Sequence, residues 1–253
     1  MLDQKSIGVV IPALNEEENI GGVVRSLPSW VDIIVVADNG SADKTGVEAS
    51  RYGAKVVYEA RRGYGSACLA GLAFLRGNPP DIVVFTDADG SDDPGQFIDL
   101  IIPLCNGPYQ MTIASRATGN VEKGSLSFAQ RFGNWLATRL IDCFWAVRFT
   151  DLGPYRAVTW DALERMRMCD TDFGWTVEMQ IKAAKSGLNV LEIPANYRKR
   201  KKGRSKVGGS VLGSLLAGKK ILWWIFREKL QDLLPSQPQL KLTAQVKGKR
   251  GNT

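Results

Sequence analysis

The chain has 253 residues, 44% of them hydrophobic, and it carries 33 basic and 26 acidic side chains for a net charge of +7. A chain of this length and apolar content can bury a large core, which excludes a mostly disordered protein. Histidine is absent, which excludes serine–histidine nucleophile pairs and imidazole metal sites, so acid, base and metal chemistry must use other side chains.

The beginning of the chain and its cysteines both indicate a cytoplasmic protein. The first 18 residues include Asp3, Lys5 and Pro12 and end on three consecutive glutamates, a pattern unlike a secretory signal. The four cysteines are far apart and form no CxxC pair, which disfavours a disulfide framework and a zinc site. We expect these cysteines to be reduced, buried thiols.

Short β-branched runs alternate with helical patterns through the first half of the chain. Each run is almost continuously apolar, as expected for strands that are covered on both faces of a sheet. Asn15 and Ser41 precede two of the helical patterns, and we expect both side chains to cap helix N-termini. The alternation predicts an α/β fold with a doubly wound, mostly parallel sheet. The predicted strands are 7–12, 32–38, 54–60, 81–89 and 110–116, and the predicted helices are 16–27, 43–52, 65–76 and 95–104.

Polar loops follow the first four predicted strands. They are PALNEEEN, ADNGSADKT, EARRGYGSA and DADGSDD, and in doubly wound sheets such loops meet at one edge, where ligands bind. Each loop alone is explained by a turn with a helix cap, but the four together predict a ligand cleft. The glycines of GYGSAC lack the third glycine of a dinucleotide fingerprint, and the chain contains no P-loop pattern, so neither phosphate-binding motif accounts for this cleft.

The loop after the fourth strand contains two aspartates one residue apart. Alternate side chains of an extended segment point the same way, so Asp87 and Asp89 can reach one hard cation. Mg²⁺ is typically held by one or two carboxylates plus substrate phosphates, and Mn²⁺ prefers similar ligands. The alternative is a solvated acidic turn that caps the helix near Pro94. The position at a strand end favours a metal-diphosphate site.

The excess positive charge lies in one segment. Residues 196–206 contain seven basic and no acidic side chains, and removing seven from 33 leaves 26, which equals the acidic total. This segment has three alternative interpretations: a loop that binds phosphates, a solvated run of charges, or a nucleic-acid-binding surface. The last is disfavoured because the remaining chain is neutral and carries no recognisable nucleic-acid-binding module, so we expect no nucleic-acid partner.

Two later stretches are predicted to form amphipathic helices. Residues 207–234 contain an uncharged run of 12 residues before Lys219 and Lys220, which is shorter than the ~20 residues that cross a bilayer. This helix, and a second over residues 127–147, can lie in the headgroup region of an anionic membrane. Packing against the domain, or against a second copy in a homo-oligomer, is the alternative. Residues 235–253 form a polar, basic tail.

Seven motifs spread over residues 6–206 give the chain a specific resemblance. It resembles the inverting glycosyltransferases of family 2, which have the GT-A fold, and is similar in particular to the dolichyl- or polyprenyl-phosphate sugar synthases. The resemblance implies a catalytic domain over residues 1–206, followed by the amphipathic helix and the tail. The motifs are VVIPALNEEENI, IIVVADNGSADKT, RRGYGSACLAGL, FTDADGSDDP, TDLGPYRAV, FGWTVEMQIKA and RKRKKGRSK.

Matching positions carry the family's roles onto individual residues. The resemblance implies that Asp87 and Asp89 hold Mg²⁺ or Mn²⁺ on the diphosphate of the donor. It implies a phosphate-gathering acceptor region formed by Arg131, Arg200, Ser205 and Lys206. The implied nucleotide-sugar pocket contains Pro12, Asn15, Glu16, Asp38, Asn39, Arg62, Gly63, Asp87, Ala88 and Arg116.

Two departures from the family pattern concern the donor. Asn39 stands where these enzymes often carry a second aspartate, and Ser91 stands where the dolichol-phosphate mannose synthases carry glutamine. The DNGS form of the second loop is more similar to enzymes that use UDP-sugars than to those that use GDP-mannose. The resemblance therefore implies a UDP-hexose donor, with UDP-glucose preferred.

The implied chemistry is displacement at the anomeric carbon with inversion, and the need for a base stays open. An alcohol acceptor requires a carboxylate base, for which Asp151 is preferred over Glu178. A phosphate acceptor has its second pKa near ~6 and is already largely dianionic at neutral pH, so base catalysis becomes minor. As alternatives, Asp151 caps a turn and Glu178 lies on a helix surface.

Together these features predict a peripheral enzyme on the cytosolic face of a membrane that moves a hexose from UDP to polyprenyl phosphate. Transfer to a soluble or glycolipid acceptor is the alternative within enzymes. A non-catalytic nucleotide-sugar or membrane binding module with the same fold is the alternative from another class.

Overall fold

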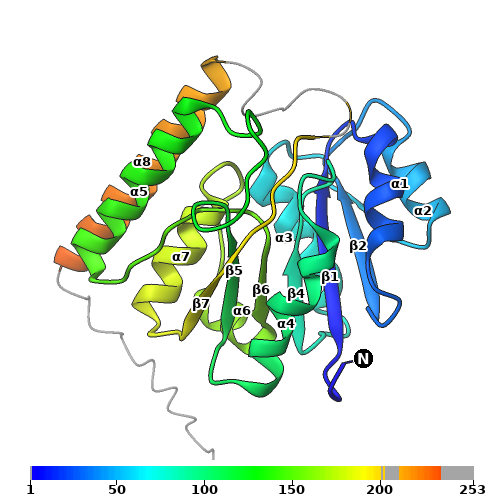
Figure 1. Cartoon of the computed structure of the whole chain (residues 1–253), viewed down its shortest axis with the longest axis horizontal. Coiled ribbons are helices and arrows are strands. Elements are labelled where there is room, and N and C mark those ends of the chain that lie inside the picture. Colours follow the sequence, from blue (N-terminus) through cyan, green and yellow to red (C-terminus); the bar gives the residue numbers. More distant parts are fainter. Residues whose placement is uncertain (1, 201, 203–210, 235–253) are drawn as a thin grey trace, which may run out of the picture.

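The strands of the protein form a single mixed sheet. The computed structural model describes residues 2–200, 202 and 211–234, and within them seven strands pair in the order β3-β2-β1-β4-β6-β5-β7 (Figure 1). The strands are β1 (Ile7–Ala13), β2 (Ile33–Asp38), β3 (Lys55–Tyr58), β4 (Ile82–Phe85), β5 (Met111–Ser115), β6 (Arg156–Thr159) and β7 (Val190–Pro194). β1 is parallel to β2 and β4, and β6 is antiparallel to both β4 and β5.

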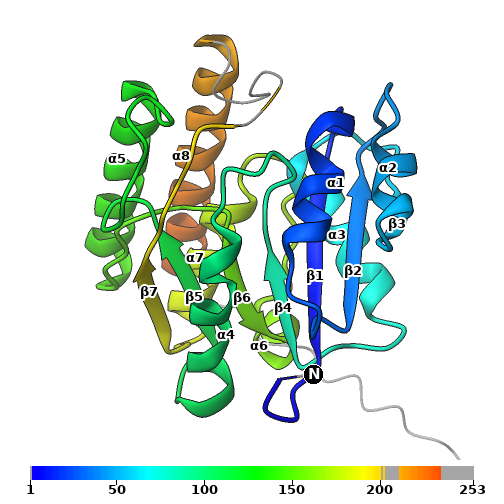
Figure 2. The same ribbon diagram turned by 45° about the vertical axis from the view of Figure 1, so that its right-hand side comes forward.

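Helices cover both faces of this sheet (Figure 2). They are α1 (Glu17–Ser26), α2 (Thr45–Arg51), α3 (Tyr64–Leu75), the 3₁₀ turn η1 (Pro94–Gln96), α4 (Phe97–Asn106), α5 (Phe128–Trp145), α6 (Trp160–Met166), α7 (Trp175–Lys185) and α8 (Val211–Leu233). One buried cluster joins the sheet to α1, α2 and α4, and a second joins it to α3, α5, α6, α7 and α8.

Strand β1 shows why these strands are apolar along their whole length. Its side chains point alternately to the two faces, so Val10 packs with Leu72 in one cluster while Val9 and Ile11 pack with Ile20 in the other. All seven residues of β1 are buried. The doubly wound, mostly parallel sheet predicted from this pattern is confirmed.

The expected role of Asn15 and Ser41 as helix caps is wrong, because the two side chains join neighbouring loops instead. Asn15 N donates to Ser41 Oγ at 2.9 Å, and Ala42 N donates to Asn15 Oδ1 at 2.8 Å. Asp38 holds the same loop by accepting from Ser41 N at 2.8 Å. These bonds fix the loop after β1 against the loop after β2, so both strand ends are held together. Helix α1 is instead preceded by Glu16, whose side chain makes no cap bond.

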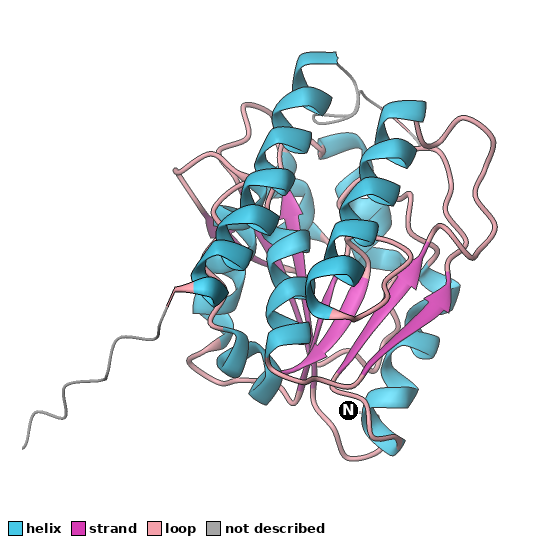
Figure 3. Ribbon diagram, turned by 90° about the vertical axis from the view of Figure 1, so that its left-hand side faces the viewer, coloured by secondary structure: helices cyan, strands magenta, loops and turns pink. Residues whose placement is uncertain are grey.

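The predicted amphipathic helices correspond to α5 and α8, which lie side by side (Figure 3). The Phe144 and Phe226 rings meet with centroids 5.9 Å apart, and Trp145 Nε1 donates to Asp232 at 2.8 Å. The buried Trp224 on α8 reaches Asp170, in the turn before α7, with its indole nitrogen. Helix α8 therefore packs against the rest of the molecule through one face.

The described part of the chain holds no helix with the length and apolar content that a bilayer crossing requires. All four cysteines are free thiols, in agreement with the absence of a disulfide framework. The expectation that they are buried holds for Cys68 but is wrong for Cys143 and Cys169, which are exposed.

Candidate active site

A pocket of about 650 Å³ lies at the carboxyl ends of β1, β2 and β4 and is closed on one side by α5 and α8. This is the edge at which the polar loops were expected to meet. The predicted residues that line it are Pro12, Glu16, Asn39, Arg62, Gly63, Asp87, Ala88, Asp89, Arg116 and Arg200. The predicted residues that do not line it are Asn15, Asp38, Arg131, Asp151 and Glu178, while Ser205 and Lys206 lie outside the described residues.

Asn39 joins the loops that follow β2 and β3. Its Oδ1 accepts from Gly63 N at 2.8 Å, and its Nδ2 donates to the carbonyl oxygens of Arg61 at 2.7 Å and Glu59 at 3.2 Å. An aspartate could accept the first bond but could not donate the other two. This pairing is a physical reason for asparagine at a position where the resembling enzymes often carry aspartate.

Gly63 and Gly65 allow two backbone segments to touch. Gly63 has a φ of 139°, and a Cβ there would lie 2.0 Å from the carbonyl oxygen of Thr171. A Cβ on Gly65 would lie 2.1 Å from the carbonyl oxygen of Asp170. Only glycine permits this approach, which brings the turn containing Asp172 to the rim of the pocket.

Asp87 and Asp89 both face the pocket from the turn after β4. Tyr64 donates its hydroxyl to Asp87 Oδ1 at 3.2 Å, while Ser91 N donates to Asp89 Oδ1 at 2.9 Å. Burial raises the pKa of Asp87 well above its usual range, and the nearby carboxylates of Asp92 and Asp89 raise it further. Burial also raises the pKa of Asp92 to about 6. Burial and the neighbouring carboxylates therefore both disfavour the charged form of Asp87.

Arg200 brings positive charge from the basic segment to this turn. Its Nη2 lies 3.1 Å from Asp89 Oδ2, and its Nη1 donates to Glu16 Oε1 at 2.6 Å. Glu16 also accepts from Asn19 Nδ2 at 2.8 Å. One guanidinium thus links the loop after β1 to the acidic turn after β4, at the lining of the pocket.

The donor set fits a divalent cation that shares its coordination with a substrate. Asp87 and Asp89 supply hard carboxylate oxygens, which Mg²⁺ and Mn²⁺ prefer. A bound cation would favour the charged form of a carboxylate whose pKa burial has raised. Among the described residues, no three acidic or cysteine side chains lie close enough together to hold a metal ion. Asp87 and Asp89 therefore fit a cation whose remaining coordination positions are filled by substrate phosphates.

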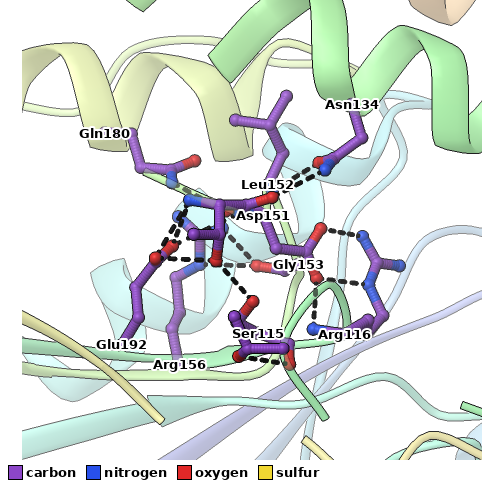
Figure 4. Close-up of polar contacts among 11 residues, drawn as sticks. Ser115, Arg116, Asn134, Asp151, Leu152, Gly153, Arg156, Gln180 and Glu192 are labelled. Atoms are coloured by element: carbon purple, nitrogen blue, oxygen red, sulfur yellow. Dashed lines mark hydrogen bonds and ion pairs between the residues drawn. The ribbon is translucent and has the colours of Figure 1, made fainter. Parts of the chain in front are cut away.

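Asp151 serves to orient Arg116 (Figure 4). The carboxylate is 2% exposed and accepts from Arg116 Nε at 2.7 Å, from Nη2 at 2.8 Å and from the backbone N at 2.7 Å. Arg116 also lies over the Tyr197 ring, with its Cζ 5.3 Å from the centroid, and it lines the pocket. This bidentate ion pair fixes the direction of the guanidinium. The geometry therefore does not support Asp151 as a base, because its oxygens are engaged behind the pocket wall.

The backbone around Asp151 is fastened by side chains of α5 and β7 (Figure 4). Asn134 Nδ2 donates to the Thr150 carbonyl at 2.9 Å, and Leu152 N donates to Asn134 Oδ1 at 2.8 Å. Glu192 accepts from Thr150 N at 2.9 Å. The loop that holds Arg116 is thus rigidly attached to the helix that forms the pocket wall.

Glu178 is fully buried on α7 and does not reach the pocket. Its carboxylate accepts from the backbone N of Cys169 at 2.8 Å and of Asp170 at 2.7 Å, and it pairs with Lys182 Nζ at 2.6 Å. These contacts hold the turn that approaches Gly65. The sequence allowed two roles for Glu178, a base at the pocket or an exposed residue on a helix surface. Its burial away from the pocket supports neither.

Several pocket residues were not selected from the sequence. Tyr64 contacts Asp87, Tyr197 lies under Arg116, and Asn134 and Asp172 line the wall. Tyr64 lies within the RRGYGSA motif, which was the only local signal. Tyr197 lies in the basic segment and Asn134 in the predicted helix 127–147, but neither pattern indicates that these residues, or Asp172, meet the pocket, because tertiary packing of distant segments brings them there.

Comparison with known proteins identifies the family. The model of glycosyl transferase family 2 matches residues 8–163. The chain belongs to this family. An uncharacterised glycosyltransferase of Mycobacterium tuberculosis is 35% identical over 212 residues, which are 84% of this chain and 94% of that protein. A dolichyl-phosphate hexose transferase of Haloferax volcanii is 29% identical over 228 residues, which are 89% of this chain and 96% of that protein.

The fold also matches a solved structure. The crystal structure of glucosyl-3-phosphoglycerate synthase from Mycobacterium tuberculosis, in complex with Mn²⁺, UDP and phosphoglyceric acid, has a TM-score of 0.70 and 24% identity. The match covers 89% of this chain and 79% of that protein. The family 2 glycosyltransferase described here therefore has the GT-A fold, and the expected class of enzyme is confirmed.

Proposed function

We propose that this glycosyltransferase moves a hexose from a UDP-sugar to a polyprenyl phosphate, with inversion and with Mg²⁺ or Mn²⁺ as cofactor. The observation that carries the proposal is one pocket in which Asp87 and Asp89, Arg116 and Arg200, and the wall of α5 and α8 meet. The acidic pair suits a metal-bound diphosphate, and the guanidinium groups suit phosphate oxygens. The wall also contains apolar side chains, among them Leu152, Phe173 and Ile221, which can contact a hydrocarbon chain.

The donor end of the pocket is formed by the loops after β1, β2 and β3, where Pro12, Asn39 and Arg62 line it. UDP as the nucleotide is supported by the DNGS form of the loop at residues 38–41. It is also supported by the similar fold of glucosyl-3-phosphoglycerate synthase, which was crystallised with UDP and Mn²⁺. Glucose is the hexose that we propose on the same grounds.

The acceptor phosphate supplies the nucleophile in the proposed reaction. One of its oxygens bonds to the anomeric carbon while the bond from that carbon to the β-phosphate oxygen breaks, and UDP leaves with the electron pair. A phosphate dianion has no proton to lose, so the chain needs no base. This agrees with the engagement of Asp151 by Arg116. A bound divalent cation would neutralise charge on the leaving diphosphate.

The chain's own cations act on the phosphates. Arg116 is held from behind by Asp151 and from one face by Tyr197, so it meets a charged oxygen without reorganisation. Arg200 is paired with Asp89 and Glu16 and lies beside the acidic turn. We assign Arg116 to the donor and Arg200 to the phosphates shared by donor and acceptor.

A lipid acceptor is supported by a relative and by the surface of the molecule. The Haloferax volcanii relative is named for transfer of a hexose to dolichyl phosphate. Phe128, Phe132 and Trp135 on α5, and Trp223 and Phe226 on α8, are large apolar side chains that lie exposed. We propose that these helices rest on the cytosolic face of an anionic membrane.

The test is transfer by the purified protein. We expect label from UDP-glucose, supplied with Mn²⁺ or Mg²⁺ and a C55 polyprenyl phosphate in detergent, to enter the organic phase, and EDTA to abolish transfer. Parallel reactions with other UDP-hexoses and with GDP-mannose identify the donor. Label that stays in the aqueous phase with every donor, or that enters only a soluble phosphorylated acceptor such as phosphoglycerate, would contradict the lipid acceptor.

A further inference from the structure

The substrate pocket has two chemically different ends. Asp87, Asp89 and Arg200 lie at the end nearest β1 and β4, whereas the lining from α5 and α8 at the other end is uncharged and, apart from Gln130 and Asn134, small or apolar. The contributions of these helices include Ala129 and Gly133 from α5 and Ala217, Gly218 and Ile221 from α8. A ligand that fills both ends must therefore carry a charged head and an apolar body.

Among the described residues, the ring contact and the side-chain hydrogen bond between the two helices lie near their C-terminal ends. The contacts of Phe144 with Phe226 and of Trp145 with Asp232 join their C-terminal halves. Gly133 and Gly218 lie in the N-terminal halves, at the pocket lining. Because the C-terminal halves are paired, the helices run side by side in the same direction (Figure 3), and the pocket lies where their N-terminal halves begin.

Gly133 and Gly218 leave space that the described residues do not fill. A Cβ on either one would have no described atom within 4 Å. Elsewhere near the pocket glycine is needed for packing, since a Cβ on Gly174 would lie 2.2 Å from the Trp224 ring and one on Gly63 would meet backbone at 2.0 Å. Glycine inside a helix destabilises it relative to alanine. Among the described residues, therefore, no contact requires glycine at either position, and the pocket reaches both.

The outer surface beside Gly133 is apolar. Phe128 is 84% exposed, and its ring stacks on Phe132 with centroids 6.4 Å apart. Phe132 in turn meets Trp135 at 5.8 Å. These side chains follow one another along α5 at helical spacing, next to the positions that line the pocket. A hydrocarbon chain that leaves the pocket beside Gly133 thus meets an apolar surface.

We propose that Gly133 and Gly218 determine acceptor specificity by leaving a passage between α5 and α8 for the hydrocarbon chain of a polyprenyl phosphate. The phosphate of this acceptor lies at the Arg200 end of the pocket, and the chain leaves between the two glycines. The inference rests on the proposed function, which it deepens by assigning residues to recognition of the chain. Side chains at these positions narrow the passage and shift preference towards acceptors without a long chain.

The experiment compares Gly133→Leu, Gly218→Leu and the double variant with the wild type on two acceptors, a C55 polyprenyl phosphate and methyl phosphate. We expect kcat/KM for the long acceptor to fall about tenfold or more in each single variant, as for other pockets that reject added methylenes. The value for methyl phosphate stays within about twofold of the wild type, and so does Mn²⁺-dependent binding of UDP. Arg139→Leu, which adds an apolar side chain at an exposed position of α5 outside the pocket, is the matched control.

The outcomes separate the inference from the proposed function. If the wild type transfers to the C55 acceptor but the leucine variants keep the same ratio between acceptors, the passage assignment is wrong and the function stands. If the wild type transfers to no prenyl phosphate, both are wrong. Gly133→Ala and Gly218→Ala add one methyl group each, and a graded fall from alanine to leucine supports the passage even if a leucine variant is unstable.

Discussion

At the scale of single residues, the site depends on side chains that hold other side chains. Asp151 does not line the pocket, yet its carboxylate receives three bonds from Arg116. The TDLGPYR motif identified Asp151 but not its role, because the sequence does not show that residues 116 and 151 meet. This ion pair sets the position of the Arg116 guanidinium, which we propose acts on the donor, while Asp151 itself lies outside the pocket lining.

We predict that Asp151→Asn lowers kcat/KM for the donor by about a hundredfold, because the guanidinium of Arg116 loses its bidentate partner. Removing one partner of a buried pair also lowers the free energy of unfolding by about 3 kcal/mol. The shape of the profile of kcat against pH stays unchanged, since no proton passes through Asp151. Donor kinetics, denaturant unfolding and the pH profile together check this expectation. A stable variant that loses one limb of its pH profile would restore Asp151 as the base.

Asp89→Ala tests the acidic turn. We expect at least a hundredfold loss of transfer, since one carboxylate alone holds the metal-diphosphate weakly. Binding of UDP in the presence of Mn²⁺, measured by calorimetry, should weaken in parallel, while binding of UDP in EDTA changes little. Asp99→Ala, which removes a carboxylate from the first turn of α4 outside the pocket, is the matched control. Full activity of Asp89→Ala would refute the metal assignment.

At the scale of elements, the sequence predicts strands best where both faces are buried. The parallel strands β1, β2 and β4 form continuous apolar runs, and these were found within a few residues of their bounds. β4 ends at Phe85 instead of residue 89, because the Asp92 carboxylate accepts from Thr86 Oγ1 and Asp87 N and turns the chain there. β7 was missed, and so was β6, which has only four residues. Its antiparallel pairing depends on long-range packing that no local pattern encodes.

Asp81 fastens the start of β4 to the start of β1, and its pKa gives a pH-dependent prediction. Its carboxylate accepts from Ser6 N at 2.8 Å and Ser6 Oγ at 2.9 Å, and the bond from Ser6 N lowers its pKa most. A carboxyl whose pKa is lower in the folded state stabilises the fold above its unfolded pKa of about 3.9. This stabilisation is lost as the pH falls through the folded pKa.

We therefore expect Asp81→Asn to lower the free energy of unfolding by about 1 kcal/mol at pH 7, a modest value because water screens this partly exposed group. The difference between variant and wild type should shrink as the pH falls below about 4. Urea unfolding at pH 7, 5 and 3.5 measures it. A difference that stays constant over this range would mean that the charge of Asp81 contributes nothing.

At the scale of the whole molecule, the pocket joins segments that are distant in sequence. The rule that ligands bind at strand carboxyl ends was enough to bring together Pro12, Asn39 and Asp87. It could not anticipate that α5 and α8 close the pocket, because helix periodicity shows an apolar face but not the partner of that face. The side of α8 that carries Trp224 is buried, while the side that carries Phe226 is exposed.

The exposed face of α5 and α8 leads to the last prediction, on membrane association. The protein should sediment with vesicles that contain anionic lipid and release as salt rises, since each basic residue near such a surface contributes about 1 kcal/mol that salt screens. Phe128→Ser combined with Trp135→Ser removes two large exposed side chains from α5 and should weaken partitioning about tenfold. Val47→Ser, which removes an apolar side chain that is 65% exposed on α2, is the matched control and should leave partitioning unchanged. The alternative is that this face binds a second copy of the chain. In that case all variants would sediment equally, and size-exclusion chromatography would show a dimer that the α5 substitutions dissociate.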